Sequence, residues 1–279
     1  MRPASSRWPF GGMALAALVA LPVPGAAQGV LAFARLSLVE SRVELARKGG
    51  PWQAAAEGGP LQVGEALRTG PEAVARLELP WMALTLGPGA TLGFPDAYLL
   101  SASLESGRAL VDSPSREALK IVTAEAEVRG QGRAVVRRDG KATTVSCLAG
   151  KFVVQGGEAS VTLTAGRGTV VASGRPPSPP EAVPAALSEG QWPGADPVYV
   201  APGEPVELRW KGRAASASYV VELLPVGSDS VLLQREVKDP PARIAVPWEG
   251  AFRWRVSARD ARGLEGMPSA DGLIAVDSR

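Results

Sequence analysis

Alternation between apolar and polar residues is clearest from Leu61 to Leu79, where the sequence reads LQVGEALRTGPEAVARLEL. In its second half two sets of residues alternate: Ala75, Leu77 and Leu79 against Val74, Arg76 and Glu78. A period of two predicts a half-buried strand. Gly64 and Gly70 precede this strand, and we expect the chain to reverse at both, because glycine adopts positive φ without penalty.

Short apolar runs separated by glycine and proline continue from Leu31 to Ala172 and predict many short strands. The stretch LKIVTAEAEVRG, which ends at Gly130, alternates throughout and predicts one strand. The best-defined hairpin lies around Asp139-Gly140, since this dipeptide favours a two-residue primed turn. Hairpin-like units recur at unequal spacing, which favours an irregular twisted β-roll or stack of hairpins over a regular solenoid.

The composition changes between residues 173 and 197, where RPPSPPEAVP carries five prolines. Proline at this density favours extended polyproline geometry, so we interpret the segment as a semi-rigid linker. A ligand for an SH3-like groove is the alternative, and it fits an exported chain poorly.

Residues 198–279 contain six aromatic side chains and can build a core of their own. The strongest strand is FRWRVSARD, in which Phe252, Trp254, Val256 and Ala258 share one face. Arg253, Arg255 and Arg259 share the other face and could meet a carboxylate or a phosphate. Such a stripe is more often the hydrated side of an antiparallel sheet, which is what we expect here.

Seven residues of the first stretch carry a resemblance to a known family. Their pattern of leucine, glycine, threonine-glycine and an alternating strand resembles the FecR domain, a periplasmic all-β module: Leu61, Gly64, Leu67, Thr69, Gly70, Leu77 and Leu79. The resemblance implies an all-β fold in residues 28–172 and gives these residues structural roles. FecR proteins that regulate sigma factors also carry a cytoplasmic segment and a transmembrane helix. We find neither here, so the resemblance implies a sensing or docking surface and not sigma regulation.

The last segment resembles a fibronectin type III domain, an immunoglobulin-like sandwich. The stretches VELRW, SYVVEL, FRWRVSARD and GLEGMPS carry this resemblance over nearly all of residues 198–279. Phe252 stands where the family usually has a tyrosine, so the hydroxyl that pins the neighbouring loop is missing.

The amino terminus resembles a secretory signal peptide. Arg2 and Arg7 precede an apolar run from Phe10 to Val23, and small residues lead up to a cleavage site expected between Ala27 and Gln28. Fourteen helical residues extend only about 21 Å, short of the roughly 30 Å of a bilayer core, which argues against a membrane anchor. We therefore expect a periplasmic or secreted protein with no membrane span after cleavage of residues 1–27.

Export changes the charge balance of the chain. The whole sequence has 30 basic and 28 acidic residues, and residues 1–27 contain two arginines and no acidic residue. The mature chain is therefore formally neutral, and we exclude nucleic acid as a partner. The single cysteine, Cys147, allows no intrachain disulfide and fits a small buried hydrophobe better than intermolecular pairing.

The residues needed for common catalytic and metal sites are missing. The chain contains no histidine, which removes the Ser-His-Asp and Cys-His arrangements together with histidine-based metal sites. Gly130-Gln131-Gly132 lacks the helix of a dinucleotide loop, and Ser115 and Lys120 lack the Ser-x-x-Lys spacing. We expect neither a cofactor nor a metal, and no enzymatic activity.

These patterns together predict an exported, non-enzymatic envelope protein that recognises another envelope protein through strand edges and loops. The alternative is a module that binds envelope polysaccharide or peptidoglycan, for which exposed aromatic platforms are needed. Trp52 and Trp81 are the candidates in residues 28–172. The sugar-binding hypothesis gains if both are exposed on one face and loses if both are buried.

Overall fold

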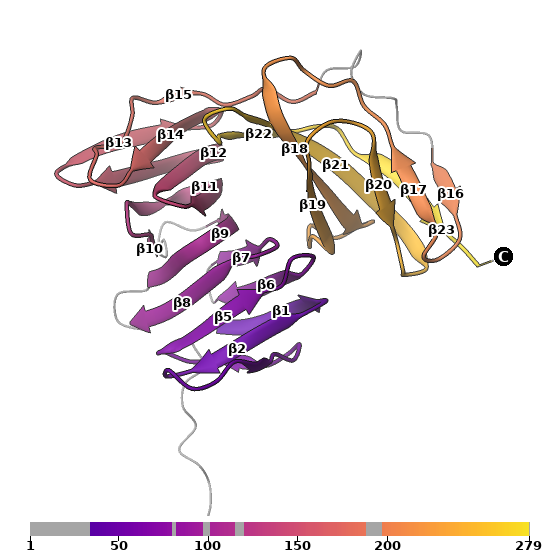
Figure 1. Ribbon diagram of the computed structural model, residues 1–279, viewed down its shortest axis with the longest axis horizontal. Helices are drawn as coiled ribbons and strands as arrows, with labels where there is room; N and C mark the ends of the chain where they lie inside the picture. Colours follow the sequence, from indigo (N-terminus) through magenta and orange to yellow (C-terminus); the bar gives the residue numbers. More distant parts are fainter. Residues whose placement is uncertain (1–33, 80–81, 97–100, 115–119, 188–196, 279) are drawn as a thin grey trace, which may run out of the picture. The chain divides into compact units, whose positions relative to one another are not determined.

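Strands account for all the regular secondary structure of the described residues, which confirms the expected all-β fold. The computed structural model describes residues 34–79, 82–96, 101–114, 120–187 and 197–278 (Figure 1). The expected signal peptide and its cleavage site at Ala27 and Gln28 lie outside these residues, as does Trp81. Within them, no helix has the length and apolarity needed to cross a membrane.

Residues 34–187 form what we call the amino-terminal body, whose strands are connected in one hydrogen-bonded sheet. Its strands are β1 (Ala34–Glu40), β2 (Val43–Arg47), β3 (Gln53–Ala54), β4 (Pro60–Leu61), β5 (Glu65–Thr69), β6 (Val74–Leu79), β7 (Met82–Leu86), β8 (Thr91–Asp96), β9 (Ser101–Ser113), β10 (Lys120–Val122), β11 (Glu127–Asp139), β12 (Ala142–Gly156), β13 (Ala159–Thr164), β14 (Arg167–Ala172) and β15 (Glu181–Ala182).

This sheet folds into two layers because its three longest strands pass from one layer to the other. The amino-terminal half of β9 pairs with β8, and its carboxyl-terminal half pairs with β7 and β11. Likewise, β12 pairs with β14 at its start and with β13 at its end. We call the layer containing β1, β6, β7 and β14 the second layer, in which β6, β7 and β9 are successive neighbours (Figure 1).

Glycine permits the crossing between layers. Gly107 of β9 and Gly132 of β11 adopt φ of 84° and 118°, and Gly150 of β12 adopts 79°. A Cβ at Gly132 would lie 2.1 Å from the carbonyl oxygen of Ala149, and one at Gly150 would lie 2.1 Å from that of Gln131. The paired strands therefore approach so closely at the bend that no side chain fits.

The core of the amino-terminal body lies between its two layers. Leu67 of β5 contributes to it from one layer, together with Leu92 and Phe94 of β8. Leu77 of β6 and Leu84 of β7 contribute from the second layer. All five are at most 1% exposed. In β6, the side chains that enter the core are the apolar set of the predicted alternation: Ala75, Leu77 and Leu79.

Two local predictions differ from the structure. The stretch predicted as one strand up to Gly130 is a hairpin, because the Thr123 hydroxyl accepts a hydrogen bond from the Ala126 amide (2.9 Å) and closes a turn between β10 and β11. The hairpin around Asp139 exists, but Asp139 pairs with Ala142, so its two-residue turn is Gly140-Lys141. Gly140 supplies the positive φ of this turn at 61°.

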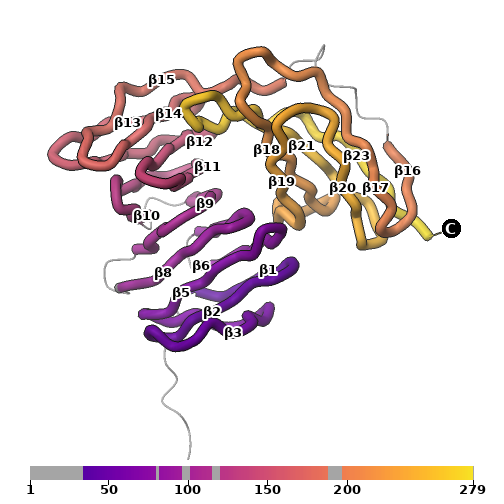
Figure 2. Tube along the Cα trace, in the orientation of Figure 1, coloured from indigo at the N-terminus to yellow at the C-terminus, as the bar shows by residue number. Residues whose placement is uncertain are grey.

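The proline-rich segment, predicted as a linker over 173–197, lies against the sheet in its described part, residues 173–187. Strand β15 pairs with β14 (Figure 2), and the Ser178 carbonyl accepts a hydrogen bond from the Thr169 hydroxyl at 2.7 Å. Val183 and Leu187 are buried. Proline favours the extended conformation, but the residues between the prolines keep their amides and use them to pair with the sheet edge.

Residues 197–278 form the carboxyl-terminal body, a sandwich of two sheets around one core. Its strands are β16 (Val198–Val200), β17 (Pro205–Leu208), β18 (Ser216–Pro225), β19 (Leu233–Val237), β20 (Ala242–Ala245), β21 (Gly250–Asp260), β22 (Glu265–Pro268) and β23 (Gly272–Val276). The larger sheet has the order β16-β23-β21-β18-β19, with β22 beside β21, and the smaller one pairs β17 with β20. The predicted inward face of β21, from Phe252 to Ala258, is buried in this core.

Candidate functional site

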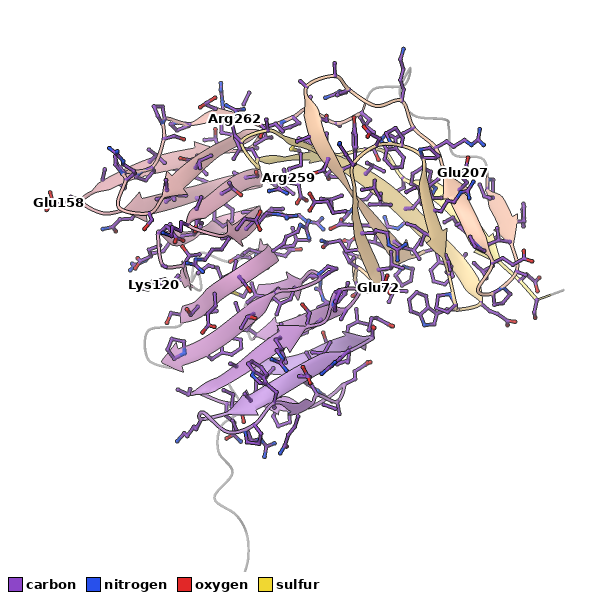
Figure 3. All side chains as sticks on the ribbon, viewed as in Figure 1. Glu72, Lys120, Glu158, Glu207, Arg259 and Arg262 are labelled. Atoms are coloured by element: carbon purple, nitrogen blue, oxygen red, sulfur yellow. The ribbon has the colours of Figure 1, made fainter. Side chains whose placement is uncertain are left out.

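The outward face of β21 is not the hydrated surface that was expected, because its arginines are buried or half-buried and are paired with carboxylates. Arg255 is only 8% exposed, and its Nε donates to Glu222 Oε2 on the neighbouring strand β18 at 2.8 Å. Arg259, labelled in Figure 3, donates to Asp139 at the tip of the β11–β12 hairpin, also at 2.8 Å. The arginine stripe therefore meets carboxylates, as its alternative interpretation allowed, but these carboxylates belong to the same chain.

Arg108 of β9 is the centre of this contact. It is 3% exposed, and its guanidinium binds Glu265 in bidentate fashion, with Nε–Oε2 and Nη2–Oε1 distances of 2.8 and 2.6 Å. Its Nη2 also donates to Glu222 at 3.0 Å, and its Nη1 donates to the Gln234 side-chain oxygen at 2.7 Å. All three partners come from the carboxyl-terminal body, and each is at most 5% exposed. We call these residues with Arg255 the Arg108 network.

The charges in the Arg108 network hold one another in the ionised state. Burial alone would lower the pKa of Arg108, but the charges of Glu265 and Glu222 outweigh it and raise that pKa. Burial alone would raise the pKa of Glu222, but Arg108 and Arg255 lower it overall. Buried charges are tolerated only when they are paired and hydrogen-bonded in this way.

A second, more hydrated group of charges lies beside the first around Glu236 of β19. Its carboxylate accepts hydrogen bonds from Arg137 (2.9 Å), Arg259 (2.8 Å) and Ser218 (2.6 Å). Burial raises the pKa of Glu236, but the charge of Arg137 and these hydrogen bonds lower it to about 2. Glu236 is therefore ionised throughout the physiological pH range.

Apolar contacts flank the charged groups. Val74 of β6 packs with Leu224 and Val231, and Leu110 of β9 belongs to a cluster that Met267 of β22 contacts. Val74, Leu224 and Val231 are fully buried. The outward side chains of Val74 and Leu110 are thus covered, and β7, which lies between their two strands, is buried on both faces.

A cleft of about 950 Å³ opens next to the two charged groups. One wall consists of turns of the amino-terminal body, at residues 40–41, 71–72 and 88–89, together with the tip of the β11–β12 hairpin. The other wall consists of residues 232–236 and of Pro247 and Trp248. We call it the β19 cleft. Its volume lies within the range typical of ligand pockets in proteins.

The family-motif residues do not line this cleft and have structural surroundings. The four leucines are buried: Leu61, Leu67, Leu77 and Leu79. The Thr69 hydroxyl donates to the Gly87 carbonyl at 2.6 Å and accepts from the Ala90 amide at 2.9 Å. Gly64 has φ of 82°, as expected. Gly70 is different, because its φ is not positive, and a Cβ there would lie 3.2 Å from the Arg42 carbonyl oxygen, which is a tight contact.

Of the two tryptophans considered for sugar binding, Trp52 is the one that the structure describes. Trp52 is half-buried, and the Arg68 guanidinium lies over its ring, 4.4 Å from the centroid. One face of the Trp52 ring is therefore occupied. The aromatic side chain that lines the β19 cleft is Trp248, which is half-buried.

Other candidate groups have no reactive surroundings. Cys147 is fully buried, and burial raises the pKa of its thiol to about 11. A buried, protonated thiol is inert, as a small core residue would be. Among the described residues, no three His, Cys, Asp or Glu side chains are grouped so that they could hold a metal ion.

Sequence reasoning did not single out Arg108 or its partners, although one signal was present. Glu222 interrupts the apolar run of SYVVELLP, with two apolar residues on each side. A run apolar at successive positions is typical of a strand buried on both faces. A glutamate in such a run needs a partner, and that requirement was the available indication of a buried ion pair.

Comparisons with known proteins give limited information. No model of a known protein family matches the chain. No curated protein matches it either. Two crystal structures titled "putative anti-sigma factor" from Parabacteroides distasonis ATCC 8503 are similar over 40% of this chain, with 17% identity and TM-scores of 0.36 and 0.35. The match spans 56% of those chains, about half their length. At this similarity it carries no argument about function.

Proposed function

We propose that the protein is an exported, non-enzymatic component of the cell envelope that senses or docks onto another protein. The observation that supports this most is the β19 cleft, whose walls come from two β-bodies held by buried ion pairs. A binding surface with fixed walls loses little conformational entropy when a partner binds. Such preorganisation suits recognition by contact.

The export part of the proposal rests on the signal-peptide pattern of residues 1–27. Amino-terminal sequencing of the protein recovered from the periplasm or the medium tests it. We expect the mature chain to begin at Gln28. An intact Met1 terminus on protein recovered from the cytoplasm would contradict export.

The FecR-like and fibronectin-like assignments belong to the proposal as well. The motif leucines occupy the core of a two-layered β-body, and the last segment forms a sandwich of two sheets. Both arrangements are compatible with the resemblances. The proposed partner surface is formed by turns and a strand edge, and no cofactor is needed for it.

Binding of envelope polysaccharide or peptidoglycan is the second candidate function. Trp248 in the wall of the β19 cleft favours it, because its ring could stack on a sugar. The Arg68 guanidinium over Trp52 counts against a platform at that position. The protein-binding proposal therefore ranks first.

A binding experiment with the purified mature chain separates the two candidates. The immobilised chain is offered solubilised envelope proteins in one arm, and isolated peptidoglycan and envelope polysaccharide in the other. We expect saturable retention of one protein, weakened at least tenfold by Trp248→Ala, with Trp52→Ala as the matched control. Retention of glycan alone would replace the proposal by its alternative, and retention of neither would contradict both.

A further inference from the structure

Strand β19 has an edge without a neighbouring strand in the part of the chain that the structure describes. The larger sheet of the carboxyl-terminal body ends at β19, whose one partner there is β18. An open edge presents backbone N–H and C=O groups that another extended chain can pair with. The surroundings of this edge decide what can reach it.

The β19 cleft follows this edge. Side chains alternate along a strand, so a cavity against the face of a sheet contacts every second residue. The β19 cleft is instead lined by five successive residues, Leu232 to Glu236. Continuous lining of this kind is expected when the cavity lies along the strand edge, within reach of the main chain.

From this arrangement we propose that the β19 cleft binds an extended segment of another polypeptide, which adds to β19 as a new edge strand. The proposal rests on the proposed protein-binding function and names its site and the form of its ligand. Backbone pairing would supply affinity, and the side chains of the segment would supply specificity.

The opposite wall suits a single extended chain and excludes a folded body. It is built from turns that include Pro71 and Pro88, and proline has no amide hydrogen to offer to a ladder. A volume of about 950 Å³ accommodates a segment of a few residues, whereas a second folded copy of this chain cannot enter. A strand facing the five residues from Leu232 to Glu236 is about 16 Å long, at roughly 3.3 Å per residue.

The side chains around the edge indicate which residues the segment carries. Trp248 and Leu232 offer a partly exposed apolar surface next to the edge. We expect the segment to place an aliphatic or aromatic side chain there. Because successive side chains of a strand point in opposite directions, its neighbours face the charged groups at Arg138 and Asp139 and are expected to be polar.

Charged residues commonly protect open edges from pairing, and Arg235 of β19 could have this role. Its guanidinium pairs with Glu72 at 2.7 Å and donates to the Arg243 carbonyl at 3.3 Å. Glu72, labelled in Figure 3, keeps 74% of its side-chain exposure, and Arg235 keeps 40%. An exposed pair of this kind contributes little to stability, so an incoming segment can displace it.

Site-specific photo-crosslinking tests the site in cells that make the protein. A benzophenone amino acid replaces Arg235 in the cleft, Tyr199 on the exposed face of β16, or Glu158 in the β12–β13 turn, the last two being controls outside the cleft. We expect one protein adduct from position 235, at least tenfold more abundant than from either control.

The crosslinked segment, made as a synthetic peptide, then tests the mode of binding to the purified mature chain. Adding a strand uses the amides of every second residue of the peptide. N-methylation at alternate positions should therefore weaken binding about fivefold or more, and methylation at the positions between should leave it unchanged. A methylation scan without this alternation would overturn the edge-strand proposal.

The remaining outcomes separate this inference from the proposed function. A protein adduct from position 199 or 158 but not from 235 would overturn the site and leave protein binding intact. A glycan adduct from position 235, or an adduct of two copies of this chain, would contradict the proposal that the cleft binds a segment of another polypeptide. No protein adduct from any position would contradict the proposed function itself.

Discussion

Arg108 is the residue on which the contact between the two bodies depends most. It pairs with two carboxylates and one amide oxygen, all buried. Among the residues that the structure describes, the carboxylate of Glu265 is paired with Arg108 alone. Glu222 differs, because Arg255 also pairs with it. Loss of Arg108 therefore leaves Glu265 as the uncompensated charge.

We predict that Arg108→Ala lowers the free energy of unfolding by about 3–5 kcal/mol, as expected when one partner of a buried ion pair is removed. Urea denaturation measures the change. Arg42→Ala is the control, since Arg42 keeps 74% of its side-chain exposure in its pair with Glu44, and it should cost less than about 1 kcal/mol.

The double variant Arg108→Met/Glu265→Met tests the reason for that loss. It removes both charges of the bidentate pair and keeps Glu222 paired with Arg255. We expect it to recover at least half of the stability lost in Arg108→Ala. A double variant that is as unstable as the single one would show that the cost comes from packing and not from the stranded carboxylate.

The lowered pKa of Glu236 predicts how the stability of the fold depends on pH. Its pKa falls from an ordinary value of 4.5 to about 2 in the folded protein, so its ionised form stabilises the fold above pH 4.5. That contribution is lost as the pH falls from about 4.5 to 2. We expect it to be about 1 kcal/mol, because the side chain keeps 31% of its exposure and solvent screens the pairs.

Denaturation of the wild type and of Glu236→Gln at pH 7 and pH 3 measures this contribution. The variant should be less stable at pH 7 and should lose less stability than the wild type on acidification. Equal slopes for the two proteins would contradict the lowered pKa of Glu236.

At the scale of the elements, the fold depends on β11 and β12 bending together. Their ladder runs from Glu127 to Asp139, and both strands contribute to both layers. The bend occurs where Gly132 faces Gly150. Neither position can hold a side chain without moving the facing backbone.

We predict that Gly132→Ala costs about 3 kcal/mol or more, because a Cβ would clash with the Ala149 carbonyl and φ is 118°. Gly166→Ala is the matched control: its φ is also positive, at 77°, but a Cβ there meets nothing within 4 Å. That variant should cost about 1 kcal/mol. Thermal denaturation compares the two, and equal losses would show that close approach is not the reason for the glycine.

Sequence patterns predicted the elements better than their pairing. The alternation in residues 252–260 gave the inward face of β21 correctly, from Phe252 to Ala258. It could not say what covers the outward face, because an arginine facing water and one facing a buried glutamate look alike in a single sequence. Thr123 shows the same limit locally, since one side-chain hydrogen bond turned an alternating stretch into a hairpin.

At the scale of the whole molecule, the contacts that matter most join residues far apart in the chain. Arg108 and Glu265 are separated by 157 positions, which no periodicity can connect. The proline-rich segment predicted a spacer between independent bodies, whereas residues 173–187 pair with one body and Leu187 enters the core of the other. The β19 cleft is lined by residues of both bodies, so it could not be predicted without knowing how they contact each other.

The central claim is that the two bodies form one cooperative unit, which gives the β19 cleft its fixed walls. Calorimetry of the mature chain tests it directly, because the ratio of calorimetric to van't Hoff enthalpy reports how many units unfold independently. We predict a single transition with a ratio close to 1 for the wild type. Two transitions, or a ratio near 2, would contradict the claim and show that the bodies unfold separately.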